Sequence, residues 1–331
     1  MIVAVTGAAG HIGANLVREL LRRGQRVRAL VRSDTRALEG LALERVPGDT
    51  LEPASLDTLF RGAELVYHLA GRISIVGDQD GLVMRTNHLG TRNVVEAALR
   101  AGARRLVHFS SIHALVQQPL DQPLDESRPL AGEDTPAYDR SKAAGEREIL
   151  AGVQRGLDAV MVNPTSVFGP EDHKPSLMGQ VILDLVHRKF PALVAGGFDW
   201  VDVRDVVQGA MAAAERGRTG ERYLLGGRWH SVRQLAEQVE LASGVRQSRL
   251  VAPLWLARVG VPFVGAYSRI ARRAPLFTKE SLDALQGHRQ ILHDKASREL
   301  GYQPRPLADT VRDTIEWFRQ AGRLERTRDC A

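Results

Sequence analysis

The N-terminal segment constrains the fold most, because it joins a β-branched run, a glycine turn and an amphipathic helix without interruption. Residues 2–5, Ile-Val-Ala-Val, are typical of a strand buried on both faces. The turn Thr-Gly-Ala-Ala-Gly-His-Ile-Gly follows at residues 6–13, and apolar residues then recur at helical spacing up to Gly24, which is placed to cap a helix. Backbone N–H groups in such a turn, at the positive end of a helix dipole, suit a pyrophosphate. The alternative is that the glycines serve only a tight turn and close helix packing.

The residue that follows the second predicted strand, at residues 26–31, distinguishes between two dinucleotides. NAD sites usually place an acidic side chain there for the ribose hydroxyls, whereas an arginine can hold the 2′-phosphate of NADP. This chain has Arg32, which favours NADP(H). NAD(H) stays open if Arg32 is only a solvated residue and Asp34 turns inward. Asp49, after another short strand, either accepts a hydrogen bond from the adenine amino group or only shapes a turn.

Two later strands carry candidate residues to the same crevice. Residues 65–71 end in small side chains that let the backbone approach a ligand, and residues 106–109 deliver Ser110 and Ser111 to the end of a strand. Ligands of open α/β sheets bind at the carboxyl ends of the strands. A serine pair after a strand is often only a helix cap or turn, but its place before Tyr138 favours catalysis. We expect Ser111, with Ser110 as second choice, to donate to a substrate oxygen.

Tyr138 and Lys142 lie four residues apart in the run Tyr-Asp-Arg-Ser-Lys, within a segment of helical composition. They therefore share one helix face. A phenol titrates near pH ~10, and a fixed ammonium nearby favours its anion. We expect Tyr138 to exchange a proton with a carbonyl or alcohol oxygen as hydride moves. Lys142 is expected to lower the pKa of the phenol and to hold the nicotinamide ribose. The alternative is a packed tyrosine with Lys142 in solvent.

These motifs resemble those of the extended short-chain dehydrogenase/reductases over nearly the whole chain. Residues 6–13 are similar to the TGxxGxxG of that family and residues 138–142 to its YxxxK. Residues 163–170, Asn-Pro-Thr-Ser-Val-Phe-Gly-Pro, resemble the segment that lies against the nicotinamide. Residues 199–206 resemble a later strand and helix that return to the nucleotide domain. The resemblance implies an α/β fold with a Rossmann-type doubly wound parallel sheet and a smaller, mostly α-helical substrate lobe.

Within the family, residues 30–32, 109–111 and 298–307 are most similar to the branch that contains dihydroflavonol 4-reductase, 3β-hydroxysteroid dehydrogenase and the hopanoid-associated sugar epimerase-like proteins. That branch implies reduction of ketones or oxidation of secondary alcohols. The more distant sugar-nucleotide epimerases typically carry an acidic residue at the position of Arg32 and retain NAD through a closed cycle. The arginine therefore favours an exchanging NADP(H) and net redox chemistry.

The coenzyme site that these motifs imply is spread along the first half of the chain. Its expected residues are Gly7, Ala9, Gly10, His11, Ile12, Gly13, Arg32, Asp49, Thr50, Leu69, Ala70, Gly71, Asn87, Ser110, Tyr138, Lys142, Pro164 and Val167. His113 is an expected substrate contact or, alternatively, a hydrogen-bonded structural histidine. No metal site is expected. The resemblance also implies a homodimer, formed by the helices that begin near Asn87 and Tyr138.

The length of 331 residues exceeds the usual size of one domain. We expect a nucleotide-binding domain at residues 1–170, to which residues 195–225 return, and a substrate lobe formed by residues 171–194 and 226–331. The chain is 44% hydrophobic and 25% charged, as soluble proteins are. It shows no run of membrane-spanning length and begins directly with a strand, so we expect a cytoplasmic protein. Cys330, the only cysteine, is expected to be inert.

The formal net charge of +6 raises the possibility of nucleic-acid binding. Arginines are nevertheless spread over many predicted helices, with small clusters near the C-terminus, and aromatic residues are few. A single-strand binding surface needs interleaved aromatic side chains, and no DNA-reading motif is present. The sequence therefore argues against a nucleic-acid partner, and a modest positive field suits a phosphorylated dinucleotide.

Substrate specificity must come from the second lobe. Residues 254–264 are unusually apolar and form either a lid over an apolar substrate or a core or dimer contact. The loop at residues 117–135 either closes over the substrate or is solvated surface. We expect an NADP(H)-dependent oxidoreductase that interconverts a ketone or aldehyde and an alcohol on a fairly apolar small molecule. The alternatives are an NAD-retaining nucleotide-sugar epimerase or dehydratase and a non-catalytic dinucleotide sensor.

Overall fold

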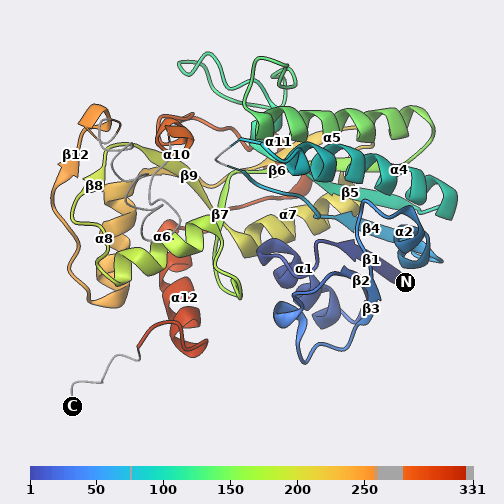
Figure 1. Ribbon diagram of the computed structural model, residues 1–331, viewed down its shortest axis with the longest axis horizontal. Coiled ribbons are helices and arrows are strands. Elements are labelled where there is room, and N and C mark those ends of the chain that lie inside the picture. The colour runs from blue at the N-terminus through green and yellow to red at the C-terminus, as the bar shows by residue number, and fades with distance from the viewer. Residues whose placement is uncertain (75–76, 257, 259–278, 326–331) are drawn as a thin grey trace.

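A seven-stranded parallel sheet forms the centre of the computed structural model, which describes residues 1–74, 77–256, 258 and 279–325 (Figure 1). The strand order is β3-β2-β1-β4-β5-β6-β10, and every neighbouring pair is parallel. The strands are β1 (Ile2–Thr6), β2 (Arg26–Val31), β3 (Glu44–Pro47), β4 (Leu65–His68), β5 (Arg105–Phe109), β6 (Ala159–Pro164) and β10 (Arg222–Leu225). The order reverses between β1 and β4, which is where ligands bind in such sheets. The predicted doubly wound α/β fold is confirmed.

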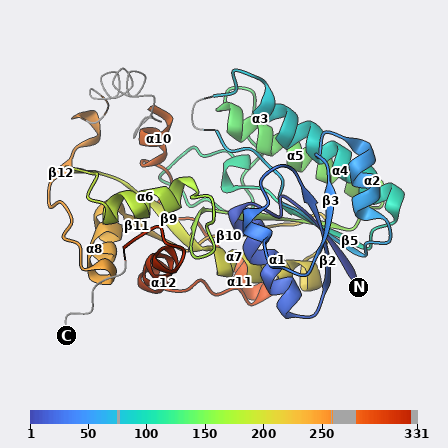
Figure 2. The ribbon, with the colours of Figure 1, turned by 60° about the horizontal axis from the view of Figure 1, so that its bottom comes forward.

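Helices cover both faces of this sheet, and each face has its own apolar core (Figure 2). One face carries α1 (His11–Arg22), α7 (Val203–Arg216) and α11 (Asp294–Leu300), and the other carries α2 (Pro53–Phe60), α4 (Gly90–Ala101) and α5 (Ala137–Gln154). Short helical turns complete this half: η1 (Arg36–Leu38), α3 (Leu82–Met84), the π-helical turn η2 (Arg85–Leu89) and η3 (Ile112–Ala114). Because the strands are buried on both faces, their sequences are almost continuously apolar.

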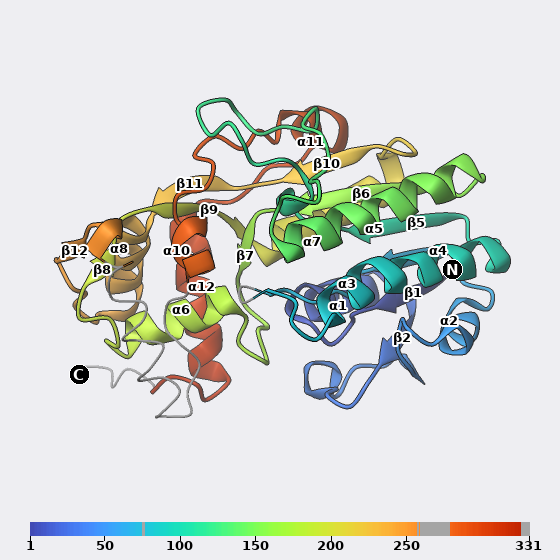
Figure 3. The ribbon, with the colours of Figure 1, turned by 45° about the horizontal axis from the view of Figure 1, so that its top comes forward.

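A second, smaller sheet lies beside the first and has its own core (Figure 3). It has the order β11-β9-β7, and a two-stranded pair β12-β8 lies further out. The strands are β7 (Ser166–Phe168), β8 (Leu193–Val194), β9 (Gly197–Asp202), β11 (Arg228–Ser231) and β12 (Val251–Ala252). The helices of this half are α6 (Leu177–Val186), α8 (Val232–Ser243), α10 (Lys279–Ala284) and α12 (Leu307–Gln320). Of the segment 195–225, α7 and β10 lie on the large sheet, whereas β9 pairs with β7 and β11.

Three short connections carry the chain between the two sheets. β6 continues into β7 across Thr165, β9 runs directly into α7 at Asp202, and β10 continues into β11 across Gly226 and Gly227. Each connection begins at or near the carboxyl end of a strand of the large sheet or at the start of a helix that covers it. The smaller sheet is therefore attached at the same edge at which ligands are expected.

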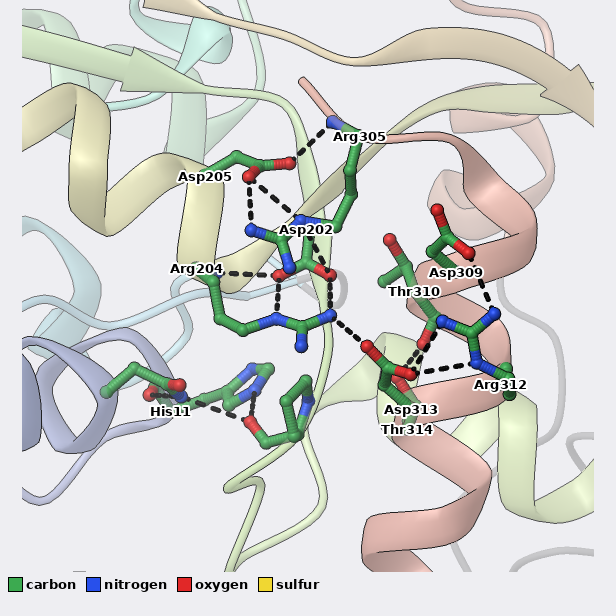
Figure 4. Close-up of polar contacts among 12 residues, drawn as sticks. His11, Asp202, Arg204, Asp205, Arg305, Asp309, Thr310, Arg312, Asp313 and Thr314 are labelled. Atoms are coloured by element: carbon green, nitrogen blue, oxygen red, sulfur yellow. Dashed lines mark hydrogen bonds and ion pairs between the residues drawn. The ribbon is translucent and has the colours of Figure 1, made fainter. Parts of the chain in front are cut away.

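A cluster of ion pairs fixes α12 to the start of α7 (Figure 4). Asp202 has no exposed side-chain surface and accepts hydrogen bonds from the backbone N–H of Arg204 at 2.7 Å and from its Nη2 at 2.7 Å. Arg204 also reaches Asp313 of α12 at 2.8 Å, and Arg305 pairs with Asp205 at 2.7 Å. The C-terminal segment is thus attached to the large sheet through charges as well as through apolar packing.

The loop at residues 117–135 is held near its middle by contacts with distant segments of the chain. Leu124 is fully buried; its N–H donates to the carbonyl of Gln290 at 2.9 Å, and its carbonyl accepts from the N–H of Leu292 at 2.9 Å. The Glu126 carboxylate accepts from the N–H of Leu224 on the edge strand β10 at 2.9 Å. Burial raises the pKa of Glu126. At least one acidic side chain of this loop is therefore a structural contact rather than solvated surface.

Part of the apolar segment at residues 254–264 lies outside the described residues. Within the part that the structure describes, Trp255 and Leu256 have exposed fractions of 66% and 48%. Cys330 also lies outside the described residues. Among the helices of the described ranges, none has the length and apolar character needed to cross a membrane.

Candidate active site

The glycine turn between β1 and α1 leaves no room for side chains at two of its glycines. Gly7 has a φ of +69°, and a Cβ added there would lie 2.5 Å from the backbone nitrogen of Ala70. A Cβ at Gly13 would lie 2.2 Å from the carbonyl oxygen of Gly7. Gly10 is the N-cap of α1 and provides no side-chain cap. The first amides of α1 are therefore not capped by that residue, and the backbone forms the kind of cradle that a pyrophosphate needs.

His11, the first residue of α1, connects this turn to the smaller sheet. Its Nε2 lies 3.0 Å from the carbonyl oxygen of Pro170, which follows β7, and Asn15 Nδ2 donates to the same oxygen at 3.1 Å (Figure 4). The side chain of His11 is thus held by the chain itself. What the turn offers to a ligand at this position is the backbone.

Most of the expected coenzyme residues lie at the carboxyl ends of the strands of the large sheet. Gly7, Ala9, Gly10, His11, Ile12 and Gly13 follow β1, Arg32 follows β2, Asp49 and Thr50 follow β3, Leu69, Ala70 and Gly71 follow β4, and Ser110 follows β5. Pro164 ends β6, Val167 is in β7, Asn87 is in η2, and Tyr138 and Lys142 are in α5. The topology thus brings residues from distant parts of the sequence to one edge of the sheet.

Arg32 lies at the outer part of this edge and is 77% exposed at its side chain. Its Nη1 lies 3.3 Å from Oδ2 of Asp49, whose other carboxylate oxygen accepts from the N–H of Leu51 at 3.0 Å. Asp49 therefore shapes the turn after β3 and faces Arg32. Asp34 is engaged elsewhere: Arg36 pairs with it at 2.8 Å, and this contact lowers the pKa of Asp34 to about 2.

The side chain of Asn87 forms its hydrogen bonds with other residues of the protein. Its Oδ1 accepts from the N–H of Arg72 at 2.7 Å, and its Nδ2 donates to the carbonyl of Arg72 at 2.9 Å and to Ser141 Oγ at 2.8 Å. Ser141 in turn donates to the carbonyl of Tyr138 at 2.7 Å. Asn87 therefore joins the segment after β4 to the first turn of α5, and so fixes the helix that carries Tyr138.

The two serines after β5 have different surroundings. Ser111 Oγ accepts from the N–H of His113 at 3.2 Å and caps the turn η3, and its hydroxyl acts to lower the pKa of the Tyr138 phenol. Ser110 Oγ is buried and has no hydrogen-bond partner among the described residues. Of the two serines, Ser111 is thus the one that acts on the phenol, and its role in orienting a substrate oxygen stays a prediction.

Tyr138 and Lys142 are both shifted by burial, in opposite senses. Burial raises the pKa of Tyr138 to about 12, and the hydrogen bond to Ser111 offsets part of that rise. Burial lowers the pKa of Lys142 to about 8. The Nζ of Lys142 donates to the carbonyl of Phe109 at 2.8 Å. The expected lowering of the phenol pKa by the ammonium is not found in this structure: burial raises this pKa, and Lys142 is not among the groups that shift it.

The ammonium of Lys142 lies close to the segment that follows β4. A Cβ added at Gly71, just after β4, would be 3.7 Å from Lys142 Nζ and 3.3 Å from Asn87 Oδ1. Gly71 belongs to the same short segment as Ala70, which contacts the glycine turn at Gly7. The proton-exchanging groups and the pyrophosphate cradle are therefore connected through one segment at the switch point of the sheet.

His113 lies beside the phenol. Its ring centroid is 5.8 Å from that of Tyr138, and its Nδ1 is 3.3 Å from a carboxylate oxygen of Asp139. The side chain of Asp139 is 10% exposed and that of His113 is 39% exposed. His113 is thus a partly open imidazole backed by a buried carboxylate, next to the candidate acid/base.

Several polar residues behind the site were not predicted. His68 at the end of β4 lies between the hydroxyls of Thr6 and Thr91, at 2.7 and 3.0 Å, and its ring centroid is 5.1 Å from that of His108 on β5. Burial lowers the pKa of His68 to about 3 and that of His108 well below its usual value, so both rings are neutral. Glu146 is also fully buried. The sequence could have indicated Glu146, because this residue lies four positions after Lys142 on the same helix face.

No group of three or more potential metal ligands gathers among the described residues. The functional groups that the described residues place at this edge are a phenol, an ammonium, two hydroxyls, an imidazole and the backbone of a glycine turn.

The chain is similar to known proteins of one family over most of its length. The model of the NAD dependent epimerase/dehydratase family matches residues 3–226. The chain is 37% identical to sterol demethylase protein B of Methylococcus capsulatus, over 98% of this chain and 100% of that protein. It is 35% identical to a putative dihydroflavonol 4-reductase of Synechocystis, over 96% of this chain and 94% of that protein. The crystal structure of a protein named gox2253 has a TM-score of 0.83 and 35% identity, with 98% of this chain and 99% of that one covered. The chain therefore belongs to the NAD-dependent epimerase/dehydratase family of extended short-chain dehydrogenase/reductases.

Proposed function

We propose that the protein is an NADP(H)-dependent oxidoreductase that interconverts a ketone or aldehyde and an alcohol. The observation that carries the proposal is the placement of Lys142 on α5, one helical turn after Tyr138, with its Nζ beside Gly71 in the segment that contacts the glycine turn. The family binds a nicotinamide dinucleotide, and its members include reductases as well as dehydratases and epimerases.

The roles of the side chains follow from their chemistry. Tyr138 donates a proton to a carbonyl oxygen, or accepts one from an alcohol in the reverse direction. Ser111 donates a hydrogen bond to the same oxygen and so orients the substrate. Lys142 holds positive charge near the phenol and favours its anion when the proton has left. His113, beside Tyr138, contacts the substrate.

The residues that would hold the dinucleotide are those at the sheet edge. The backbone from Ala9 to Gly13 receives the pyrophosphate, and Arg32 receives the 2′-phosphate of the adenine ribose. Lys142 and the segment Leu69-Ala70-Gly71 would hold the ribose of the nicotinamide, since Lys142 Nζ lies beside Gly71. When bound, the coenzyme supplies or accepts the hydride. The tight packing at Gly7 and Gly13 favours this assignment, because only a bare backbone turn fits there.

A rival function is an NAD-retaining nucleotide-sugar epimerase or dehydratase, which the family description itself favours. The two are distinguished by measuring the coenzyme content of the purified protein and the absorbance of reduced nicotinamide with a panel of apolar ketones and secondary alcohols. Net oxidation of NADPH by a ketone is the expected result. Tightly held NAD without net redox change would support the rival, and dinucleotide binding without turnover of any compound would indicate a sensor.

Replacing Arg32 by alanine is expected to weaken NADPH binding about 10- to 100-fold, the value of a charge-assisted contact to phosphate of about 1.5–3 kcal/mol. Binding of NADH is expected to change little, because that coenzyme lacks the phosphate. The measurement is the quenching of protein fluorescence by each coenzyme. Arg36→Ala is the matched control, since Arg36 is also exposed in the same loop but pairs with Asp34. An equal loss of affinity for both coenzymes in Arg32→Ala would contradict the NADP(H) assignment.

The assembly, the compartment and the substrate class belong to the same proposal. We infer a homodimer through α4 and α5, which pack side by side along one face (Figure 3), and a cytoplasmic location. Sedimentation of the purified protein tests the dimer. A fairly apolar substrate is supported by the exposed apolar side chains of Trp255 and Leu256, in the first part of the apolar segment at residues 254–264. The panel of ketones tests this substrate class.

A further inference from the structure

The carboxylate of Glu146 is buried on α5, one helical turn beyond Lys142. None of its side-chain surface is exposed. Its Oε1 accepts from Nδ2 of Asn163 on β6 at 2.6 Å, and its Oε2 accepts from Nε of Arg222 on β10 at 3.1 Å. A buried carboxylate destabilises the folded protein unless its charged and polar partners are kept. Its position next to the active site therefore calls for an explanation beyond helix packing.

The first contact leads to the catalytic serine. Nδ2 of Asn163 donates to Oε1 of Glu146 and also to the carbonyl oxygen of Ser111, at 2.9 Å. The amide of Asn163 is fully buried, so water does not replace either contact. One carboxylate on α5 thereby holds the main chain of Ser111, at the point where the chain leaves β5. The same helix carries Tyr138, so the serine and the phenol are positioned by one rigid element.

The second consequence concerns charge. Lys142 and Arg222 are two buried or nearly buried cations, with exposed fractions of 7% for Lys142 and 16% for the side chain of Arg222. The carboxylate of Glu146 favours the charged form of Lys142 and so opposes the burial that lowers its pKa. The groups that face Lys142 from the sheet are His68 on β4 and His108 on β5, and both are neutral.

On its own helix, Lys142 has Tyr138 one turn before it and Glu146 one turn after it. The phenol of Tyr138 is uncharged at neutral pH, because burial raises its pKa to about 12. Of the side chains that act on the ammonium within the described part of the chain, Glu146 is therefore the anionic one.

We propose that Glu146 is a positioning residue of the active site, which holds the main chain of Ser111 through Asn163 and keeps Lys142 charged. The proposal rests on the proposed oxidoreductase function for the meaning of the site. Its test is a direct titration of Lys142, so the two can fail separately.

The titration uses the small number of lysines. Lys142 shares the chain only with Lys174, Lys189, Lys279 and Lys295. Protein labelled with ¹³C and ¹⁵N at lysine gives few side-chain signals, and the signal that is lost in Lys142→Met identifies Lys142. The pH at the midpoint of its chemical-shift change reports its protonation, with no coenzyme or substrate needed.

Glu146→Gln keeps an oxygen acceptor for Asn163 but removes the charge. The carboxylate favours the ammonium, so its loss is expected to move the midpoint of Lys142 to lower pH by at least about one unit. Glu148→Gln is the matched control. Glu148 lies on the same helix and pairs with His88 and Arg92, so its loss removes an ion pair without moving that midpoint.

Arg222→Met provides an independent variant of opposite sign. Removal of the guanidinium leaves the Glu146 carboxylate less neutralised, and the midpoint of Lys142 is expected to rise. This variant decides the charge role if Glu146→Gln does not fold. Midpoints that stay at the wild-type value in whichever of the two variants folds would overturn that role.

Glu146→Asp tests the positioning of Ser111. The shorter side chain keeps the charge near Lys142 but withdraws from Asn163, so the midpoint of Lys142 is expected to stay close to wild type. The kcat for carbonyl reduction is expected to fall about tenfold, with an unchanged KM for coenzyme, since a small displacement of a substrate-orienting group is costly. A wild-type kcat in this variant would overturn the positioning role. If the wild type itself reduces no carbonyl compound, the oxidoreductase proposal fails, while the lysine titration still decides the charge role.

Discussion

Tyr138→Phe is expected to lower kcat for carbonyl reduction by about 10²–10⁴-fold, the usual contribution of a general acid. The ring itself is retained, so its contact with His113 and the packing at the start of α5 stay as they are. Coenzyme affinity is expected to be nearly unchanged, because Lys142 and the glycine turn are not altered. Stopped-flow absorbance of reduced nicotinamide and fluorescence titration measure the two quantities.

The matched control is Tyr223→Phe, which removes another hydroxyl from a tyrosine that lies away from the site. Tyr223 Oη donates to Glu299 at 2.7 Å and is expected to affect stability rather than turnover. Unchanged turnover in Tyr138→Phe would rule out the phenol as the acid/base. Equal losses in both variants would indicate a general structural effect instead.

Gly13→Ala is expected to lower affinity for either dinucleotide about 10- to 100-fold. The added Cβ would lie 2.2 Å from the carbonyl oxygen of Gly7 and 2.9 Å from Cα of Ala8, so the turn has to move. Overpacking of this kind costs about 1–3 kcal/mol, and the cradle for pyrophosphate is the part that is displaced. Fluorescence titration measures affinity, and thermal unfolding measures the accompanying loss of stability.

Gly24→Ala separates this effect from general damage to α1. Gly24 follows the same helix with a φ of +72°, and no atom lies within 4 Å of its added Cβ. The strain of about 1–2 kcal/mol therefore affects stability alone. If Gly24→Ala weakened the coenzyme as much as Gly13→Ala does, close backbone contact at the turn would not be the cause.

Local patterns were sufficient to predict the elements that position the site. The β-branched run, the glycine turn and the helix after it describe β1 and α1, and the strand ends before Gly71 and Ser110 lie at one edge of the large sheet. These predictions succeed because each depends on neighbours in sequence. Parallel strands then bring separate turns together without further information.

The contacts that fix the site come from distant segments, and local patterns did not reveal them. The sequence shows that Glu146 shares a helix face with Lys142. Its partner Arg222, however, lies on β10, 76 residues further along the chain. The pairing of β9 with β7 and β11 likewise joins segments that are distant in sequence, so local patterns did not predict it. The pKa of Tyr138 was misjudged for a related reason: spacing shows that an ammonium is near, but it does not show how much water is lost.

The three connections between the sheets have a consequence for any motion of the smaller sheet. The chain runs from one sheet to the other without a long loop at Thr165, at Asp202 and at Gly226-Gly227. A rotation of the smaller sheet would therefore displace β6, α7 and β10 together. β6 contains Asn163 and β10 contains Arg222, the two partners of Glu146. Any rotation of the smaller sheet is therefore transmitted to the contacts that hold the main chain of Ser111.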